Sequence, residues 1–268
     1  MYETWTQERR LEYLVEAFKA ESPAFAALQT PPDTEGRRRM LRALMNQRMP
    51  RPLPEETLRV QDEYLRERAA EKGIVSLRDI PELRRGISLW QGDITRLSVD
   101  AIVNAANSQM LGCFVPLHSC IDNCIHSFAG VQLREECARE MARLRAAHGE
   151  DYEQPTAVPM LTDAYNLPAK KVIHIVGPIV ERGLKGSHVE ALAACYRNVL
   201  ELCADSGLKS VAFCCISTGV FRFPGDRAAQ IAVRTVTDWL DAHEGRIERV
   251  IFNVFKDEDK EYYERELS

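Results

Sequence analysis

From residue 87 onward, short β-branched apolar runs alternate with long helical patterns, and this alternation restricts the possible folds more than any other feature of the chain. The apolar runs cover residues 87–90, 101–103, 171–176, 211–216 and 250–254. The helical patterns cover residues 131–148, 189–206, 226–243 and 258–267. Because strands that alternate with helices form βαβ units, the pattern predicts an α/β domain with a mainly parallel sheet covered on both faces.

The first 80 residues have a different composition, which is rich in Arg, Glu, Leu and Ala. Apolar residues recur there at helical spacing, as in Leu11, Leu14, Val15 and Phe18 and again in Met40, Leu41, Leu44 and Met45. Prolines divide the segment into short helices, and the last helix is expected to begin at Pro54 and to end near Lys72, before Gly73. We expect residues 1–80 to be a helical extension that packs on a domain formed by residues 81–268. The alternative is a solvated helical spacer.

Composition excludes several classes of function. The net charge of -5 disfavours an electrostatic nucleic-acid binder. No apolar run approaches the roughly 20 residues that cross a bilayer. The first six residues lack the basic and apolar regions of a secretory signal, and the eight cysteines, all between positions 113 and 215, form no disulfide framework. We expect a cytoplasmic protein that binds neither nucleic acid nor membrane.

A Cys-x4-His-x-Cys cluster, formed by Cys113, His118 and Cys120, is the strongest chemical signal in the chain. Two thiolates and an imidazole can bind one zinc ion and leave a fourth tetrahedral position open, which suits catalysis. Two other interpretations remain at this point. The cysteines can serve only as small hydrophobic residues, or Cys124, one helical turn beyond Cys120, can close a structural metal site.

Further polar and small-residue motifs follow the predicted strands, where ligands bind in parallel α/β sheets. They are Gln91-Gly92-Asp93-Ile94, residues 104–107, residues 217–224 and residues 253–255. In Ser217-Thr218-Gly219-Val220-Phe221, small residues precede a helix, so backbone N–H groups can converge on an anion. The segment has no P-loop lysine, which argues against nucleotide hydrolysis of that kind.

Together these motifs resemble the macrodomain family, which binds ADP-ribose. The resemblance covers about residues 87–267. The motifs that carry it are Gln91-Gly92-Asp93-Ile94-Thr95, residues 99–107, residues 165–174 and Ser217-Thr218-Gly219-Val220-Phe221. It implies a three-layer α/β/α fold with a mixed, mainly parallel sheet.

One departure from the family pattern indicates a subfamily. Where MacroD-type enzymes have a polyglycine loop, this chain has residues 112–120, followed by a helix start at Ile121-Asp122-Asn123. This replacement and the helical extension are similar to the zinc-dependent macrodomains of microbes. Those enzymes remove mono-ADP-ribose from acidic side chains of proteins and are often associated with a sirtuin-type ADP-ribosyltransferase. The resemblance thus implies one zinc ion per chain, bound by Cys113, His118 and Cys120.

The resemblance also implies roles for matched positions. Asp93 should accept a hydrogen bond from the adenine amino group, the Ile94 N–H should contact the ring, and Phe255 should stack on it. The diphosphate should lie on Ser217, Thr218, Gly219, Val220 and Phe221, with Phe221 also bounding the distal ribose.

The residues expected near the scissile bond are Asn107, which should hold the distal ribose hydroxyls, and Asp122, which should orient water or ribose. Asn104 is expected among the substrate-binding residues. Alternatively, Asp93 caps a turn and Asp122 is the N-cap of its helix. His126 and His174 are expected in the core, as is the pair Cys214-Cys215.

The expected function is zinc-dependent hydrolysis of mono-ADP-ribose from Asp and Glu side chains of modified proteins. Two alternatives remain. One is a non-catalytic reader of ADP-ribose, for which the binding residues would serve equally well. The other is a hydrolase of a small ADP-ribose ester. The Cys113, His118 and Cys120 cluster separates a hydrolase from a reader, because a reader needs no open metal site beside the ribose.

Overall fold

A six-stranded sheet forms the centre of the protein in the computed structural model, which describes residues 4–268. Its strand order is β2 (Ile87–Gln91), β8 (Arg249–Val254), β7 (Ser210–Phe213), β4 (Ala101–Ala106), β6 (Lys171–Val176) and β5 (Met160–Asp163). All neighbours pair in parallel except β5, which runs antiparallel to β6. The mixed, mainly parallel sheet predicted from the sequence is confirmed.

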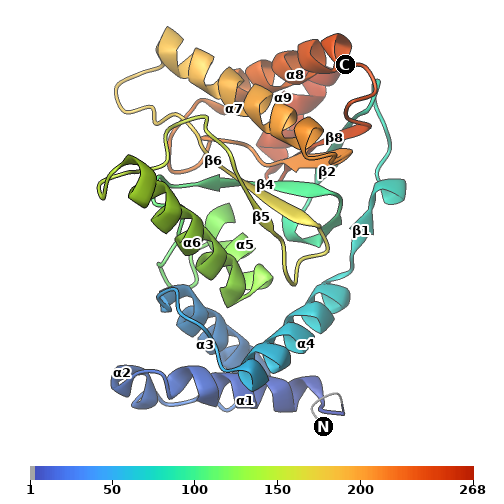
Figure 1. The fold of residues 1–268 in the computed structure, drawn as a ribbon. Helices are drawn as coiled ribbons and strands as arrows, with labels where there is room; N and C mark the ends of the chain where they lie inside the picture. The colour runs from blue at the N-terminus through green and yellow to red at the C-terminus, as the bar shows by residue number, and fades with distance from the viewer. Residues whose placement is uncertain (1–3) are drawn as a thin grey trace.

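Helices cover both faces of this sheet (Figure 1). On one face lie α7 (Gly186–Asp205), α8 (Gly225–Ala242) and α9 (Asp257–Leu267), and on the other lie α5 (Ile121–Ala129) and α6 (Val131–His148). Helix α8 buries residues that recur every three or four positions, among them Ala229, Ala232, Val236 and Trp239, so one apolar face packs inward. The three-layer α/β/α fold is therefore confirmed. In the described part of the chain, every helix is too short or too polar to span a membrane.

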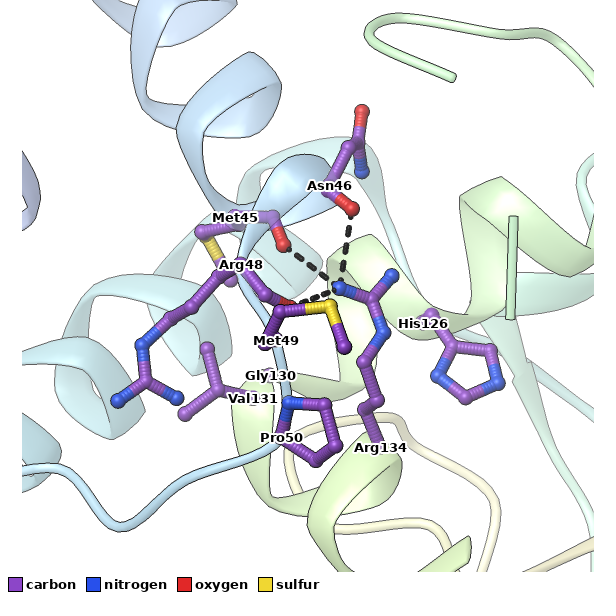
Figure 2. Close-up of a pocket in the computed structure, with 9 residues that line it drawn as sticks. All are labelled: Met45, Asn46, Arg48, Met49, Pro50, His126, Gly130, Val131 and Arg134. Carbon is purple, nitrogen blue, oxygen red and sulfur yellow. Dashed lines mark hydrogen bonds between the residues drawn. The ribbon is translucent and has the colours of Figure 1, made fainter. Parts of the chain in front are cut away.

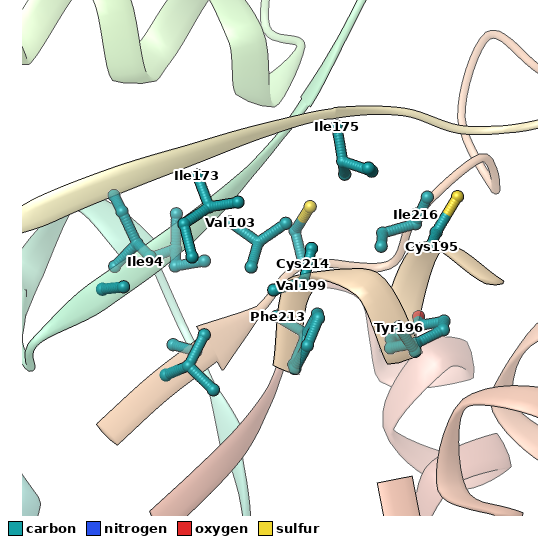
Figure 3. Close-up of a cluster of buried hydrophobic side chains, with 14 of the residues drawn as sticks. Ile94, Val103, Ile173, Ile175, Cys195, Tyr196, Val199, Phe213, Cys214 and Ile216 are labelled. Carbon is teal, nitrogen blue, oxygen red and sulfur yellow. The ribbon is translucent and has the colours of Figure 1, made fainter. Parts of the chain in front are cut away.

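β-Branched residues of the central strands fill the core between the sheet and α7 (Figure 3). Val103 of β4 and Ile173 of β6 are fully buried, and they lie in one cluster with Tyr196 and Val199 of α7. Such branched side chains pack well on a pleated surface, which is why these runs form strands.

Several strands differ from the sequence prediction. Two short strands, Val75–Ser76 and Leu97–Ser98, were not predicted, and β4 continues beyond the predicted residues 101–103 to Ala106. The predicted strand over residues 211–216 ends at Phe213, and the chain then leaves the sheet toward a turn in which Ser217 has φ +66°. Strand β5 was not predicted, because it has only four residues and lies at the sheet edge with only alternate residues buried. A short half-exposed strand has too few apolar residues to be recognised by pattern.

The extension forms a helical layer beside α5 and α6. It contains α1 (Gln7–Lys19), α2 (Pro23–Ala26), α3 (Thr34–Gln47) and α4 (Glu55–Lys72), the last ended by Gly73 at φ +81°. A short strand, β1 (Val75–Ser76), then pairs with β3 (Leu97–Ser98). The 3-10 helix η1 (Leu77–Asp79) follows β1, and a second one, η2 (Ile94–Arg96), immediately precedes β3. Residues 1–3 of the predicted extension lie outside the described residues.

The extension is packed and does not form a solvated spacer. Its helices share a hydrophobic core that includes Leu14, Phe18, Leu44 and Val60, and Val131 of α6 belongs to the same cluster. One apolar cluster therefore joins the extension to the helices that cover the sheet.

Arg134 of α6 binds the end of α3 in the extension (Figure 2). Its Nη1 donates to the backbone oxygens of Met45, Asn46 and Arg48, at 3.1, 2.9 and 2.6 Å, and its Nε donates to the Leu111 oxygen at 2.8 Å. The last carbonyls of a helix have no partners within the helix, so this guanidinium donates the hydrogen bonds that they lack. Burial lowers the pKa of Arg134 to about 10, and the side chain still carries its charge at neutral pH.

We expect Arg134→Met to lower the free energy of unfolding by about 2–4 kcal/mol, because it leaves several buried carbonyls without donors while keeping an aliphatic stem. Denaturant unfolding monitored by circular dichroism measures the change. Arg143→Met on the same helix is the control, since Arg143 is exposed and pairs only with Glu140. We expect the control to change stability by less than about 0.5 kcal/mol. Equal stability of the two variants would show that the Arg134 contacts contribute nothing.

Candidate functional site

Four parallel strands bring the predicted ligand residues to one edge of the sheet. Asp93 follows β2, Phe255 follows β8, Ser217 follows β7 after a short connection, and Asn107 follows β4. Because these strands pair in parallel, their carboxyl ends lie at the same edge. The fold therefore gathers residues that are up to 162 positions apart, the separation of Asp93 and Phe255 (255 minus 93).

The metal loop, residues 112–120, brings its three predicted ligands together. One ligand atom from each of Cys113, His118 and Cys120 lies within 4.8 Å of the others, and Cys113 Sγ is 3.8 Å from His118 Nδ1. Ligand atoms around one tetrahedral zinc ion are expected about 3.3–3.8 Å apart, so small side-chain movements complete the site. Donor types and geometry both fit zinc.

Cys124 is not a member of this group. Its Sγ lies 3.5 Å from Nη2 of Arg42, on the side of α5 that faces the extension. The interpretation in which Cys124 closes a structural site therefore finds no support in the arrangement, and the three-ligand set retains an open position.

The electrostatics of the two thiols favour a cation between them. Burial raises the pKa of the Cys120 thiol to about 12, and the negative charge of a Cys113 thiolate adds to the shift. The Asn123 N–H lowers this pKa in part, because it donates to Cys120 Sγ at 3.4 Å, with Cys120 as the N-cap of α5. Two half-buried thiolates that repel each other bind a divalent ion strongly, since the ion neutralises both.

Backbone conformation fixes the start of the metal loop. Gly112 has φ +79°, and a Cβ on this residue would lie 2.8 Å from the His126 ring. Only glycine fits both the left-handed conformation and the close approach. Any other residue at position 112 would therefore change the path of the chain into the metal loop.

Asp122 lies under the loop in a polar network. Its Oδ1 accepts a hydrogen bond from Asn104 Nδ2 at 2.7 Å, and its Oδ2 accepts one from Asn107 Nδ2 at 3.4 Å. Burial raises the pKa of Asp122 to about 6. The alternative that Asp122 is an N-cap is wrong, because Cys120 holds that position.

Asn104, predicted among the substrate-binding residues, lies behind Asp122 in the sheet. It is fully buried in β4, and its Nδ2 also contacts His174 Nδ1 at 3.1 Å on the neighbouring strand β6. Asn104 holds the Asp122 carboxylate, while Asn107 is half-buried at the mouth of the site.

His126 and His174 are core residues, as expected, and with Cys137 they form a second compact group of possible metal ligands. Both nitrogens of His174 already have partners, since Nδ1 contacts Asn104 and Nε2 contacts Thr162 Oγ1 at 3.0 Å. Burial lowers the pKa of His174 to about 3, so the ring is neutral. We therefore assign this group to the packing behind Asp122.

The phosphate loop, residues 217–221, has the features of an anion site. Ser217 has φ +66°, and a Cβ on Gly177 would lie 2.0 Å from Ser217 Oγ, so a side chain at position 177 would displace the Ser217 hydroxyl. The loop is closed by the Phe223 N–H, which donates to the Ser217 oxygen at 3.0 Å. Within residues 4–268, the N–H groups of Gly219, Val220 and Phe221 have no acceptor. These unpaired donors can bind an anion.

Asp93 and Phe255 form the other end of the site. Asp93 Oδ1 accepts hydrogen bonds from Thr95 N and Oγ1 at 3.0 and 2.6 Å, so the residue does cap a turn, as the alternative held. Its Oδ2 lies 3.6 Å from Lys72 Nζ at the end of α4, and the side chain remains 32% exposed. The side chain of Phe255 is 75% exposed and offers a flat apolar surface.

Comparison with known proteins agrees with this arrangement. The Macro domain family matches residues 103–232. A relative named protein-ADP-ribose hydrolase, from Treponema medium, is 47% identical over 98% of this chain and 100% of its own length. A "probable bifunctional ADP-ribose hydrolase/ADP-ribosyltransferase" from Fusarium oxysporum f. sp. cubense is 44% identical over 88% of this chain and 42% of its own length.

A solved structure extends the likeness to the fold. The Trypanosoma brucei macrodomain in complex with ADP-ribose superposes with a TM-score of 0.65 at 28% identity, covering 85% of this chain and 95% of that one. Sequence identity along the full length and similarity of fold lead to the same conclusion. The chain belongs to the Macro domain family.

Proposed function

We propose that the protein is a zinc-dependent hydrolase that removes mono-ADP-ribose from Asp and Glu side chains of modified proteins. The observation that carries the proposal is the convergence of Cys113, His118 and Cys120 beside Asn107 and Asp122, at the sheet edge that holds the phosphate loop. The names of the full-length relatives support the hydrolase activity.

The order of the strands matches the order of groups in ADP-ribose. Asp93 and Phe255 follow the adjacent strands β2 and β8, the phosphate loop follows β7, and Asn107 and the metal loop follow β4. An extended ligand with adenine at β2 and β8 would lay its diphosphate on the phosphate loop. Its distal ribose, which carries the link to the modified protein, would then lie beside Asn107.

The residues around the distal ribose would fix its orientation. Asn107 has both donor and acceptor capacity for ribose hydroxyls, and Asp122 restrains Asn107 through the 3.4 Å contact. A zinc ion held by the metal loop would supply Lewis-acid chemistry toward a substrate oxygen or a water molecule. Holding the anomeric centre in one geometry would make attack by water effectively intramolecular.

This proposal includes a cellular setting. The protein would act in the cytoplasm and reverse the modification made by a sirtuin-type ADP-ribosyltransferase. The Fusarium relative, whose name joins a hydrolase with a transferase, supports a pairing with a transferase.

Purified protein should contain close to one zinc ion per chain, and Cys113→Ala or Cys120→Ala should lose both the zinc and the hydrolase activity. Removing one thiolate leaves two ligands, which cannot hold the ion. Elemental analysis and a mono-ADP-ribose removal assay, each with and without chelator, measure the two losses. Cys124→Ala is the matched control and should keep its zinc. Full occupancy in both loop variants would refute the ligand assignment.

Asp93→Ala should weaken ADP-ribose binding by about 1–3 kcal/mol, which is about 5- to 150-fold, without changing zinc content. Asp93→Asn should weaken it similarly, because the amide keeps the Thr95 cap but places a donor toward the adenine amino group. Calorimetry measures both variants against Asp163→Ala, whose carboxylate is paired with Lys171 at the far edge of the sheet. Unaltered affinity in the Asp93 variants would place adenine elsewhere.

The protein should hydrolyse ADP-ribose linked to Asp or Glu and leave arginine-linked ADP-ribose intact. An acyl linkage has a carboxylate leaving group and a carbonyl oxygen open to a Lewis acid, whereas a guanidinium N-glycoside would need strong acid assistance. The protein is incubated with two labelled ADP-ribosylated substrates, one with each linkage, and the loss of label from each is measured. Turnover of the arginine-linked substrate would refute the specificity, and loss of neither label would indicate a reader of ADP-ribose.

A further inference from the structure

Helix α3 of the extension contacts the metal loop through Arg42. Its Nη2 donates to the backbone oxygen of His118 at 2.8 Å and to Asn123 Oδ1 at 2.7 Å. Its Nε donates to Ser127 Oγ at 3.3 Å on α5. One side chain of the extension thus binds both a predicted metal ligand and the helix that carries another.

One turn further along α3, Asn46 makes a second contact. Asn46 is buried, its Oδ1 accepts a hydrogen bond from the Leu117 N–H at 3.0 Å, and its Nδ2 donates to Ser127 Oγ at 2.8 Å. Leu117 has φ +59°, a conformation that non-glycine residues avoid. A backbone in that conformation needs external contacts to hold it, and Asn46 supplies one next to His118.

Asn123 connects these contacts to the two cysteines. It is fully buried, its Nδ2 donates to the Cys113 oxygen at 3.2 Å, and its N–H donates to Cys120 Sγ. Because Arg42 binds Asn123 Oδ1, the amide of Asn123 is fixed with its nitrogen toward the loop. All three predicted ligands are therefore linked to α3 by one or two hydrogen bonds.

The start of the loop is also tied to α3, through Arg134. The Arg134 guanidinium holds the end of α3 (Figure 2), donates to the Leu111 oxygen just before the loop, and lies 4.2 Å from the Phe114 ring centroid. The loop is thus bound at its beginning and its end by contacts that converge on α3.

We propose that Arg42 and Asn46 are positioning residues for the metal loop, so that the extension is a functional part of the metal site. This inference rests on the proposed zinc-dependent function. Groups that orient metal ligands from behind affect metal affinity, because they lower the cost of assembling the ligands. Helix α3 therefore holds the loop close to its metal-binding geometry before the metal arrives.

The double variant Arg42→Lys/Asn46→Ala, in the full chain, tests the inference. Lysine keeps the positive charge but cannot bind His118 and Asn123 together. Zinc affinity, measured by competition with a chelator, should fall at least about tenfold. Affinity for ADP, which lacks the distal ribose, should stay within about twofold because Asp93 and the phosphate loop are unchanged. Arg37→Lys on the same helix, which pairs with Glu12 inside the extension, is the matched control and should change neither affinity.

Hydrogen exchange on the metal-free protein gives a readout that does not depend on zinc. Peptides covering the metal loop should exchange at least about fivefold faster in the double variant, while α7 exchanges as before. Unchanged zinc affinity together with unchanged loop exchange would overturn the inference. Equal losses in zinc affinity, ADP affinity and α7 protection would also overturn the inference, because they would show that the double variant destabilises the whole fold. If the wild-type protein bound no zinc but the loop exchange still rose, the zinc proposal would fall and the holding of the loop by α3 would stand.

Discussion

Parallel pairing of β2, β8, β7 and β4 is the constraint on which the site depends. In a parallel sheet every strand ends at the same edge, and each chain segment leaving that edge must turn back across the sheet before the next strand begins. The turns after these strands carry Asp93, Phe255, the phosphate loop and Asn107. Residues with no local relation in the sequence therefore line one edge, in the order that the proposed binding of ADP-ribose requires.

The metal loop depends on the start of α5. Cys120 is the N-cap of that helix, so its sulfur accepts a backbone N–H while the side chains of Cys113 and His118 approach it. Asp122, in the first turn of the same helix, faces the buried side toward Asn104. One helix start thus separates two kinds of group, sulfur and imidazole donors on the open side and a buried carboxylate behind them.

The extension joins this arrangement at two points. Arg42 and Asn46 of α3 contact the metal loop, and Lys72 at the end of α4 lies beside Asp93 and over the Phe128 ring. Burial lowers the pKa of Lys72, while the Asp93 carboxylate opposes the shift. The two ends of the proposed ligand site therefore both contact helices outside the α/β domain. The extension also shares a hydrophobic cluster with α6.

The sequence by itself determined the features that depend on local pattern. Alternating apolar runs and helical patterns predicted the parallel sheet and its layers, and Gly73 predicted the end of α4. The spacing of Cys113, His118 and Cys120 predicted a set of donors that the structure does bring together. The sequence pattern suffices to predict these features because they depend on apolar periodicity and on spacing between residues close together in the chain.

Only the tertiary structure decided the contacts that cross the chain. Arg42 is 76 positions from His118, and Asn104 is 70 positions from His174. No local pattern marks such pairs, so the sequence could not predict that Asn104 is buried and donates to Asp122. Strand β5 belongs to the same class, because only its pairing with β6 gives a four-residue segment its structure. Each of these features is set by packing and hydrogen bonds between distant segments, which exist only once the chain has folded.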